Sequence, residues 1–193
     1  MRPGLAIMDL WGLWVLSWLA AMFWSNRTEK RAGLGAEAGY RAVLILGGIL
    51  LFIPAHGYQR SLRLWHVGWN GAWICVALVA LGFIFCWWAR IHLGRLWSGT
   101  VTRKADHHIV DTGPYALVRH PIYTGLLLSV FATTAAKGTV PGVAGAIVIA
   151  IGLWMKARLE ERWLSQELGA EAYAAYRVRV PMLVPFGPKG RRS

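Results

Sequence analysis

The sequence predicts an all-α integral membrane protein with about five transmembrane helices. Hydrophobic residues make up 56% of its 193 residues and charged residues only 16%, which is too apolar for an ordinary soluble domain. The apolar residues are gathered in uncharged runs, each close to the roughly 20 residues that cross a bilayer. A soluble helical bundle built from these runs would have little polar surface to cover them. The runs are Leu10–Asn26, Ala42–Gln59, Leu64–Ala89, Pro121–Ala136 and Gly138–Met155.

The first three runs define an N-terminal membrane region, residues 1–91. The first run has no basic n-region of the usual kind and no small-residue cleavage site, so we expect a retained helix rather than a signal peptide. Tryptophans such as Trp24, Trp65 and Trp88 lie near the ends of these runs. Since indole rings favour the membrane–water interface, their positions support the predicted spans.

The last two runs predict a helical hairpin that turns at Lys137–Gly138 and Pro141. The fourth run is short, so we expect it to tilt or to be buried against its neighbours. This hairpin belongs to a second region, residues 92–193, together with a polar loop and a C-terminal helix. Turn signals in the polar loop are Gly94, Gly99 and Gly113–Pro114.

Basic residues cluster in the loop after the first run, in the segment 90–120 and in the C-terminal tail. Because basic loops stay in the cytoplasm, this pattern predicts a cytoplasmic C-terminus and an external N-terminus, with Arg60 and Arg63 as a modest exception. The net charge of +12 then comes mainly from residues that flank the spans and meet anionic headgroups. These residues form no nucleic-acid-binding motif, so we expect no nucleic-acid partner.

The segment from Gly113 to Gly125 is the most informative part of the sequence. Pro121 begins an apolar run, and proline fits the first turn of a helix because its missing N–H would be unpaired there anyway. His120 therefore stands at the helix entrance, with Arg119 just outside it. The free N–H groups and the positive end of the helix dipole favour an anion at this place.

A second group of motif residues, from Glu160 to Pro181, lies beyond the hairpin. Together with the segment from Gly113 to Gly125, this group forms a pattern that resembles that of the integral-membrane isoprenylcysteine carboxyl methyltransferases and their prokaryotic relatives. The resemblance covers residues 94–187. It is carried by Gly113, Tyr115, Arg119, His120, Pro121, Tyr123, Gly125, Glu160, Glu161, Gly169, Tyr173, Tyr176, Val180 and Pro181.

The resemblance implies a cytoplasmic pocket for S-adenosylmethionine, formed by the C-terminal half of the chain. Arg119 joins this pocket on chemical grounds, as a partner for the carboxylate of the cofactor. The positions that match the pocket are Thr100, His107, His108, Ile109, Val110, Tyr115, His120, Pro121, Ile122, Tyr123 and Glu160.

The predicted catalytic residues are Lys156, Arg158 and Glu161. In the family a basic residue on the helix after the hairpin meets the substrate carboxylate, and Lys156 stands where eukaryotic members have arginine. Because lysine lacks the bidentate fork of arginine, this difference leaves the acceptor group open.

We therefore expect a membrane methyltransferase that uses S-adenosylmethionine and methylates a carboxylate, or a similar group, of a lipophilic, isoprenylcysteine-like substrate that enters from the bilayer. The alternatives are a lipid amine N-methyltransferase, an NADPH-dependent sterol-type reductase and a non-catalytic membrane protein. The six histidines and two cysteines show no His-x-x-x-His or Cys-x-x-Cys spacing, so we expect no metal. Membrane lipids are the other expected partners.

Overall fold

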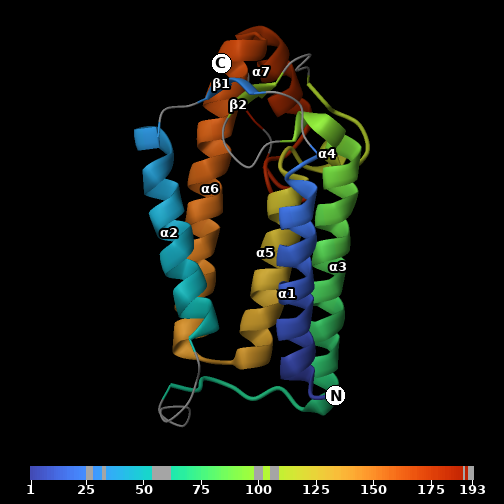
Figure 1. Cartoon of the computed structure of the whole chain (residues 1–193), viewed down its shortest axis with the longest axis vertical. Helices are drawn as coiled ribbons and strands as arrows, with labels where there is room; N and C mark the ends of the chain where they lie inside the picture. Colours follow the sequence, from blue (N-terminus) through green and yellow to red (C-terminus); the bar gives the residue numbers. More distant parts are fainter. Residues whose placement is uncertain are drawn as a thin grey trace.

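The computed structural model describes residues 1–24, 28–31, 34–53, 62–97, 102–104, 109–188 and 190. Long helices run side by side and form an elongated bundle (Figure 1). They are α1 (Pro3–Ala21), α2 (Leu34–Phe52), α3 (Trp69–Leu93), α5 (Pro121–Lys137) and α6 (Val140–Leu168). The shorter elements are a 3₁₀ turn η1 (Gly94–Leu96), α4 (Pro114–Leu117) and α7 (Ala170–Arg179).

The all-α prediction is correct for the bundle but misses one small sheet. Strand β1 (Thr28–Arg31) pairs in antiparallel fashion with β2 (Thr102–Lys104). This pairing joins the segment after α1 to the segment after α3, at the same end of the molecule as α7 (Figure 1). Two segments that were expected on the same side of a membrane are therefore neighbours in space.

Within the residues that the structure describes, three helices are long and apolar enough to cross a membrane: Pro3–Ala21, Trp69–Leu96 and Val140–Glu167. The other two long helices are less suited to a span by themselves. The 17 residues of α5 rise about 25 Å, less than the roughly 30 Å of a hydrocarbon core. Helix α2 carries Glu37 and Arg41 in its first two turns. The five-span arrangement stays a prediction, while membrane localisation is supported by the three apolar helices.

The helix bounds differ from the bounds of the uncharged runs. A helix begins and ends where the backbone conformation changes, whereas each run was bounded by charged residues. Helix α1 begins at Pro3, well before Leu10, and it includes Asp9. Proline in the first turn sets this start, whereas the run was bounded by charge. In the same way α6 continues past Met155 to Leu168 with charged residues on its last turns.

Small residues bring the long helices into close contact. Helix α3 packs most extensively on α5, and α2 on α6. At the first crossing, a Cβ atom added to Gly82 would lie 2.5 Å from the carbonyl oxygen of Gly125. At the second, a Cβ atom on Gly47 would lie 2.9 Å from the backbone nitrogen of Ile149. Glycine is needed at both crossings because backbone atoms of the facing helix occupy the space of a side chain.

The predicted hairpin turn forms where the sequence placed it. Gly138 adopts a left-handed conformation (φ 60°, ψ 37°) and its N–H donates to the carbonyl of Thr134, so it ends α5. The hydroxyl of Thr139 caps α6 by accepting from the N–H of Gly142 at 3.3 Å. The extended segment before α3 covers this turn, since the N–H of Leu64 donates to the carbonyl of Gly138 at 2.7 Å.

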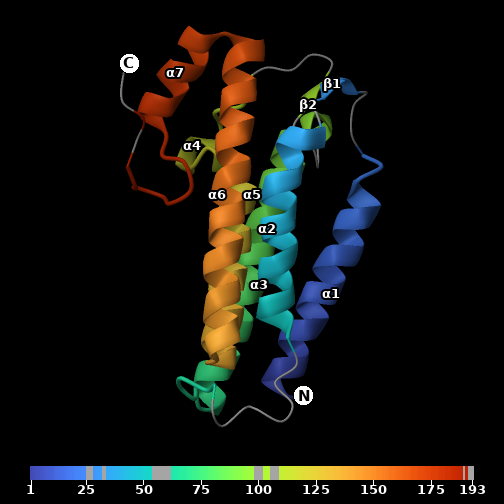
Figure 2. The same cartoon turned by 90° about the vertical axis from the view of Figure 1, so that its left-hand side faces the viewer.

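Helix α1 lies at the edge of the bundle (Figure 2) and packs mainly on α3. Its C-terminal end is held by Arg90, a fully buried residue of α3. The guanidinium of Arg90 donates to the carbonyls of Ala21 and Trp24 at 2.9 and 2.5 Å. It also lies between the rings of Trp24 and Trp97, 4.9 and 4.5 Å from their centroids. Arg90 thus satisfies carbonyls that the end of a helix leaves unpaired.

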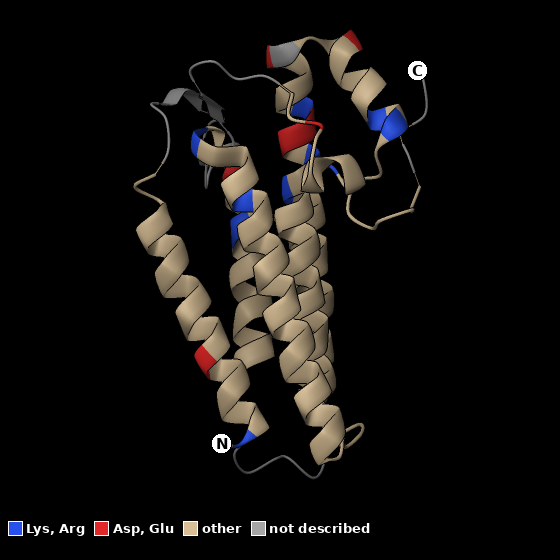
Figure 3. Ribbon diagram, turned by 90° about the vertical axis from the view of Figure 1, so that its right-hand side faces the viewer, with Lys and Arg blue, Asp and Glu red and all other residues tan. Residues whose placement is uncertain are grey.

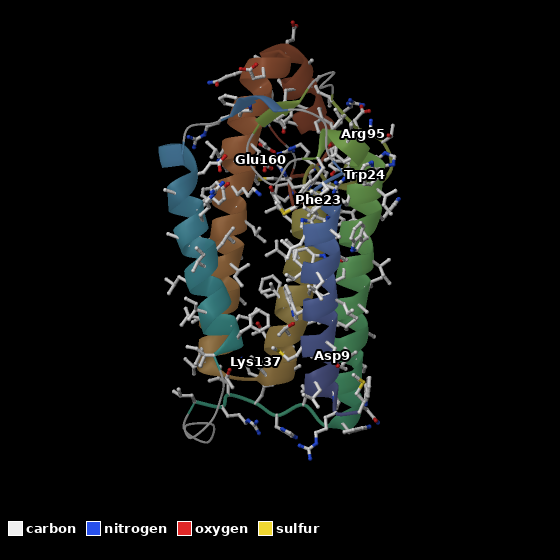
Figure 4. All side chains as sticks on the ribbon, viewed as in Figure 1. Asp9, Phe23, Trp24, Arg95, Lys137 and Glu160 are labelled. Atoms are coloured by element: carbon white, nitrogen blue, oxygen red, sulfur yellow. The ribbon has the colours of Figure 1, made fainter. Side chains whose placement is uncertain are left out.

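Charged residues gather at one end of the bundle, while the ribbon in its middle is almost free of them (Figure 3). Glu160 lies at this end, and Asp9 and Lys137 lie at the other (Figure 4). The ammonium of Lys137, at the end of α5, donates to the carbonyls of Leu51 and Ile53. Lys137 therefore pairs with backbone acceptors at the C-terminal end of α2. The charged end of the bundle is therefore the part of the molecule that can bind a polar ligand.

Candidate functional site

The site is built around the entrance of α5. Gly113 has a positive φ of 56°, and a Cβ atom there would lie 2.7 Å from the ring of His92, so glycine is required at this turn. The chain then makes the single turn of α4 and reaches Arg119 and His120. Their backbone N–H groups donate to the carbonyls of Pro181 and Met182 at 2.9 and 3.1 Å. The segment after α7 is thereby fastened to the start of α5.

Arg119 and Glu161 form a buried ion pair beneath this contact. The Nε of Arg119 donates to Oε1 of Glu161 at 2.6 Å, and both side chains are about 5% exposed or less. The Nη1 of Arg119 donates to two backbone carbonyls, those of Val180 and, at 3.2 Å, Arg177. In this structure Arg119 therefore joins α5, α6 and the end of α7, which is a positioning role. Its predicted contact with a cofactor carboxylate stays a prediction.

His120 lies between two carboxylates of α6. Its Nδ1 is 3.5 Å from Oε2 of Glu160, and its Nε2 is 3.4 Å from Oε1 of Glu161. Burial by itself lowers the pKa of His120, but the hydrogen bonds and charges of the two carboxylates outweigh it, and the pKa of His120 is raised. The two carboxylates therefore favour the protonated form of the imidazole.

Tyr123 completes this group from one turn further along α5. Its hydroxyl donates to Oε1 of Glu160 at 2.6 Å, and its ring is stacked parallel to that of His120 at 5.3 Å. Glu160 keeps 19% of its side chain exposed, against 5% for Glu161. Of the two carboxylates, Glu160 is thus the one that a ligand can reach.

Lys156 lies one turn before Glu160, with its Nζ 3.8 Å from Oε1 of that residue. The same Nζ lies 5.4 Å from the ring centroid of Tyr123 and 5.7 Å from that of Tyr40. Arg158 does not join this group. It is exposed on another side of α6, where its guanidinium packs on the ring of Trp154 at 5.4 Å.

Tyr40 of α2 is a residue that the sequence did not reveal. It is 4% exposed, and its hydroxyl makes no hydrogen bond to any described residue, although the guanidinium of Arg41 is near. An unpaired buried hydroxyl costs about 1–3 kcal/mol, which a bound ligand atom would recover. No local signal marks Tyr40, because its place beside Lys156 depends on the packing of α2 on α6.

The remaining predicted pocket residues fall into three groups. Tyr115, Pro121 and Ile122 are buried beside the site, and burial raises the pKa of Tyr115, so its hydroxyl stays protonated. Ile109 packs against Tyr173 and Tyr176 of α7, and Val110 packs against the main core. Thr100, His107 and His108 lie outside the described residues.

The charges of the site suit a ligand with an anionic group. Three basic side chains, Arg119, Lys156 and Arg177, lie near the two carboxylates, together with His120. The tyrosine hydroxyls add neutral donors. The accessible carboxylate of Glu160 can in turn accept from an ammonium or from sugar hydroxyls. A zwitterionic cofactor with a carboxylate, an ammonium and a ribose has partners for all of these groups here.

Comparisons with known proteins point to methyltransferases. A relative named cobalt-zinc-cadmium resistance protein CzcN, of Cupriavidus metallidurans, is 30% identical over 128 residues, covering 65% of this chain and 57% of that protein. Protein-S-isoprenylcysteine O-methyltransferase B of Arabidopsis thaliana is 32% identical over 114 residues, covering 58% and 57%. Methanethiol S-methyltransferase 2 of Bradyrhizobium diazoefficiens is 41% identical over 75 residues, covering 37% and 26%. The chain thus spans little more than half the length of the first two relatives.

The profile of one protein family matches residues 71–171, which is just over half of the chain. The matched range contains nearly all of α3, the entrance of α5, the hairpin and the carboxylates of α6. The Arabidopsis relative confirms the resemblance to isoprenylcysteine methyltransferases that the motifs carried. On this match, the chain belongs to the phospholipid methyltransferase family.

Proposed function

We propose that this protein is a membrane methyltransferase that uses S-adenosylmethionine and methylates a carboxylate of a lipophilic substrate. The observation that carries the proposal is the group formed by His120, Tyr123, Lys156 and Glu160, which is held at the charged end of an apolar bundle. A polar site at the end of apolar helices is accessible both to a soluble cofactor and to a substrate dissolved in the bilayer. The family and the names of its relatives support this reading.

In this proposal Glu160, His120 and Tyr40 hold the cofactor. Glu160 accepts from the ammonium or the ribose hydroxyls. His120 offers one imidazole N–H to the cofactor carboxylate in place of one of its long contacts, 3.5 Å to Glu160 and 3.4 Å to Glu161. The unpaired hydroxyl of Tyr40 is the third contact. S-Adenosylmethionine supplies a methyl group activated by a sulfonium. Arg119 and Glu161 keep the start of α5 and the end of α7 in register, so that these contacts are arranged before the ligand arrives.

Lys156 is the proposed partner of the acceptor. A carboxylate is ionised at neutral pH and needs no general base, so the protein has to orient it and to exclude water. The ammonium of Lys156, placed between two tyrosine rings, can fix one end of such an acceptor. Arg158 lies apart from this group, so we assign the role to Lys156 alone.

A second candidate acceptor is a lipid amine, and the family name favours it. The two candidates predict opposite effects of the charge on Lys156. A carboxylate acceptor loses its partner when this cation is removed, whereas a protonated amine is relieved of repulsion. The sulfur acceptor named for the Bradyrhizobium relative would be affected less than either.

The test is methyl transfer from labelled S-adenosylmethionine by the purified protein in lipid vesicles. The acceptors are a prenylated cysteine analogue, phosphatidylethanolamine and a thiol. Lys156→Met should lose activity on the carboxyl acceptor and keep its affinity for the cofactor. Arg95→Met is the matched control, because Arg95 is an exposed basic residue of η1 and lies on the opposite side of the charged end from Glu160 (Figure 4). Methyl esters are recognised by their loss in base, whereas N-methyl products are stable.

Cofactor binding is measured separately by calorimetry on the same preparations. Glu160→Gln and Tyr40→Phe should each weaken the binding of S-adenosylmethionine by about tenfold, as expected for the loss of one hydrogen bond worth about 1.4 kcal/mol. Unchanged affinity in both folded variants would overturn the cofactor assignment. Label that appears only in base-stable lipid amines would replace the carboxyl acceptor with the amine.

A further inference from the structure

A second polar feature lies on the outer side of α6, where this helix meets α7. It is a cleft of about 300 Å³, lined by Arg158, Glu161, Arg162, Ser165, Gln166 and Arg177. At roughly 30 Å³ for each water molecule, the cleft has room for about ten, which is enough for a phosphate group and part of what is attached to it. The cleft is distinct from the group around Glu160, although Glu161 and Arg177 border both.

The cleft carries more positive than negative charge. Glu161 is its one carboxylate among the lining residues, and this group already pairs with Arg119 at 2.6 Å. Arg158 and Arg162 have no carboxylate partner within the described part of the chain. They stand four residues apart on α6, a spacing at which like charges repel. Placing these two arginines side by side therefore slightly lowers the stability of α6.

Arg177 adds a third guanidinium from the facing helix α7. Its Nε lies 3.6 Å from Oε2 of Glu161 and is buried, but it forms no hydrogen bond with any described residue. The hydroxyl of Ser165 and the amide of Gln166 supply neutral donors beside it. Several guanidinium forks around a hollow match the oxygens of a phosphate group better than those of a single carboxylate.

The cleft also lies at the right height for a lipid headgroup. The apolar part of α6 ends at Met155, and Trp154 is half exposed there, as is usual for residues at a membrane interface. Arg158 and Arg162 follow three and seven residues later, which is about 5 and 10 Å along the helix. The polar layer of a bilayer leaflet is about 5–8 Å thick, so Arg158 lies within it, and the long side chain of Arg162 can extend back to the phosphates of the lipids.

We propose that the cleft between α6 and α7 binds a phosphate group, and that the headgroup of an anionic phospholipid supplies it. The bound lipid would fasten α7, and with it the segment that contacts the start of α5, to the membrane surface. The proposal concerns a site outside the proposed methyl-transfer group, so it can fail or succeed independently of that function.

The test uses native mass spectrometry of the detergent-solubilised full chain with phosphatidylglycerol, with phosphatidylcholine and with inorganic phosphate. Wild type should retain phosphatidylglycerol in preference to phosphatidylcholine. Each basic residue near the membrane surface should contribute about a fivefold gain in lipid affinity. Arg162→Gln should therefore weaken the binding about fivefold, and the double variant with Arg158→Gln and Arg162→Gln should weaken it about 25-fold. Arg95→Gln removes an equal charge from another exposed helix end and should leave the affinity within about twofold.

The melting temperature of each variant is measured in parallel, so that loss of binding is separated from loss of fold. If inorganic phosphate binds with the same dependence on Arg162 and displaces the lipid, the phosphate site is supported and its source is a soluble phosphate. If Arg95→Gln weakens lipid binding as much as Arg162→Gln, general surface charge explains the binding and the proposal is wrong. It is equally wrong if phosphatidylcholine and phosphatidylglycerol bind alike.

Discussion

The variant Glu161→Gln tests whether the buried ion pair holds the two halves of the site together. The carboxylate of Glu161 lies 2.6 Å from Nε of Arg119, 3.4 Å from Nε2 of His120 and 3.6 Å from Nε of Arg177. A neutral amide leaves these groups without their counter-charge in a buried place. Breaking a buried pair on one side typically costs about 3–5 kcal/mol. For a chain of this size, that corresponds to a fall in melting temperature of about 6–20 °C.

The assay is thermal unfolding of the detergent-solubilised protein, followed by tryptophan fluorescence. Glu171→Gln is the control, because Glu171 is an exposed acidic residue in the first turn of α7 and its loss should cost at most about 1 kcal/mol. The variant with both Arg119→Met and Glu161→Gln should lose less than the two single variants together, since the partners contact each other. The reasoning is refuted if Glu161→Gln unfolds at the same temperature as Glu171→Gln, or if the two losses simply add.

Three further predictions concern packing, pH and topology. Gly47→Val should abolish folding, because its Cβ would lie 2.9 Å from the backbone of α6. Gly48→Val is the control and should fold, since nothing lies within 4 Å of a Cβ atom there. The yield of monodisperse protein in detergent measures the folding of both variants. The raised pKa of His120 means that the folded state binds the imidazole proton more tightly than the unfolded state. The contribution of this proton to the free energy of unfolding is therefore complete below about pH 6.5, and it is lost as pH rises through the raised pKa. Melting temperatures from pH 5 to 9 should therefore fall more for wild type than for His120→Gln, and parallel curves would contradict this. Reporter fusions at Gly138 and at Ser193 should give opposite sides of the membrane, because α6 separates them; signals from one side would exclude a spanning α6.

Features that depend on neighbouring residues could be predicted. Pro121 was expected to begin a helix, and α5 begins there. Lys137–Gly138 was expected to turn the chain, and Gly138 ends α5 in a left-handed conformation. Both follow from the backbone properties of proline and glycine, which act within one turn. The family was also evident from the sequence, because its motifs are local on each side of the hairpin.

Features that join distant parts of the chain could not be predicted in the same way. The basic residue Arg119 was expected to face a ligand, but its guanidinium is engaged by Glu161 and by carbonyls at the end of α7. Arg158, expected beside Lys156, lies in a separate cleft. Tyr40 enters the site from a helix that lies outside the range of the family match.

The sequence by itself determined the apolar helices, the hairpin and the identity of the polar residues at its entrance, since these depend on composition and on bonds that reach at most four residues. The tertiary structure alone decided which of the charged residues face each other. Two charges separated by 42 positions, such as those of Arg119 and Glu161, meet only when glycine-lined crossings set the distance between helices and the end of α7 folds back on α5. Charge pairing in an apolar bundle is a property of that packing, because the desolvation cost leaves each buried charge dependent on a specific partner.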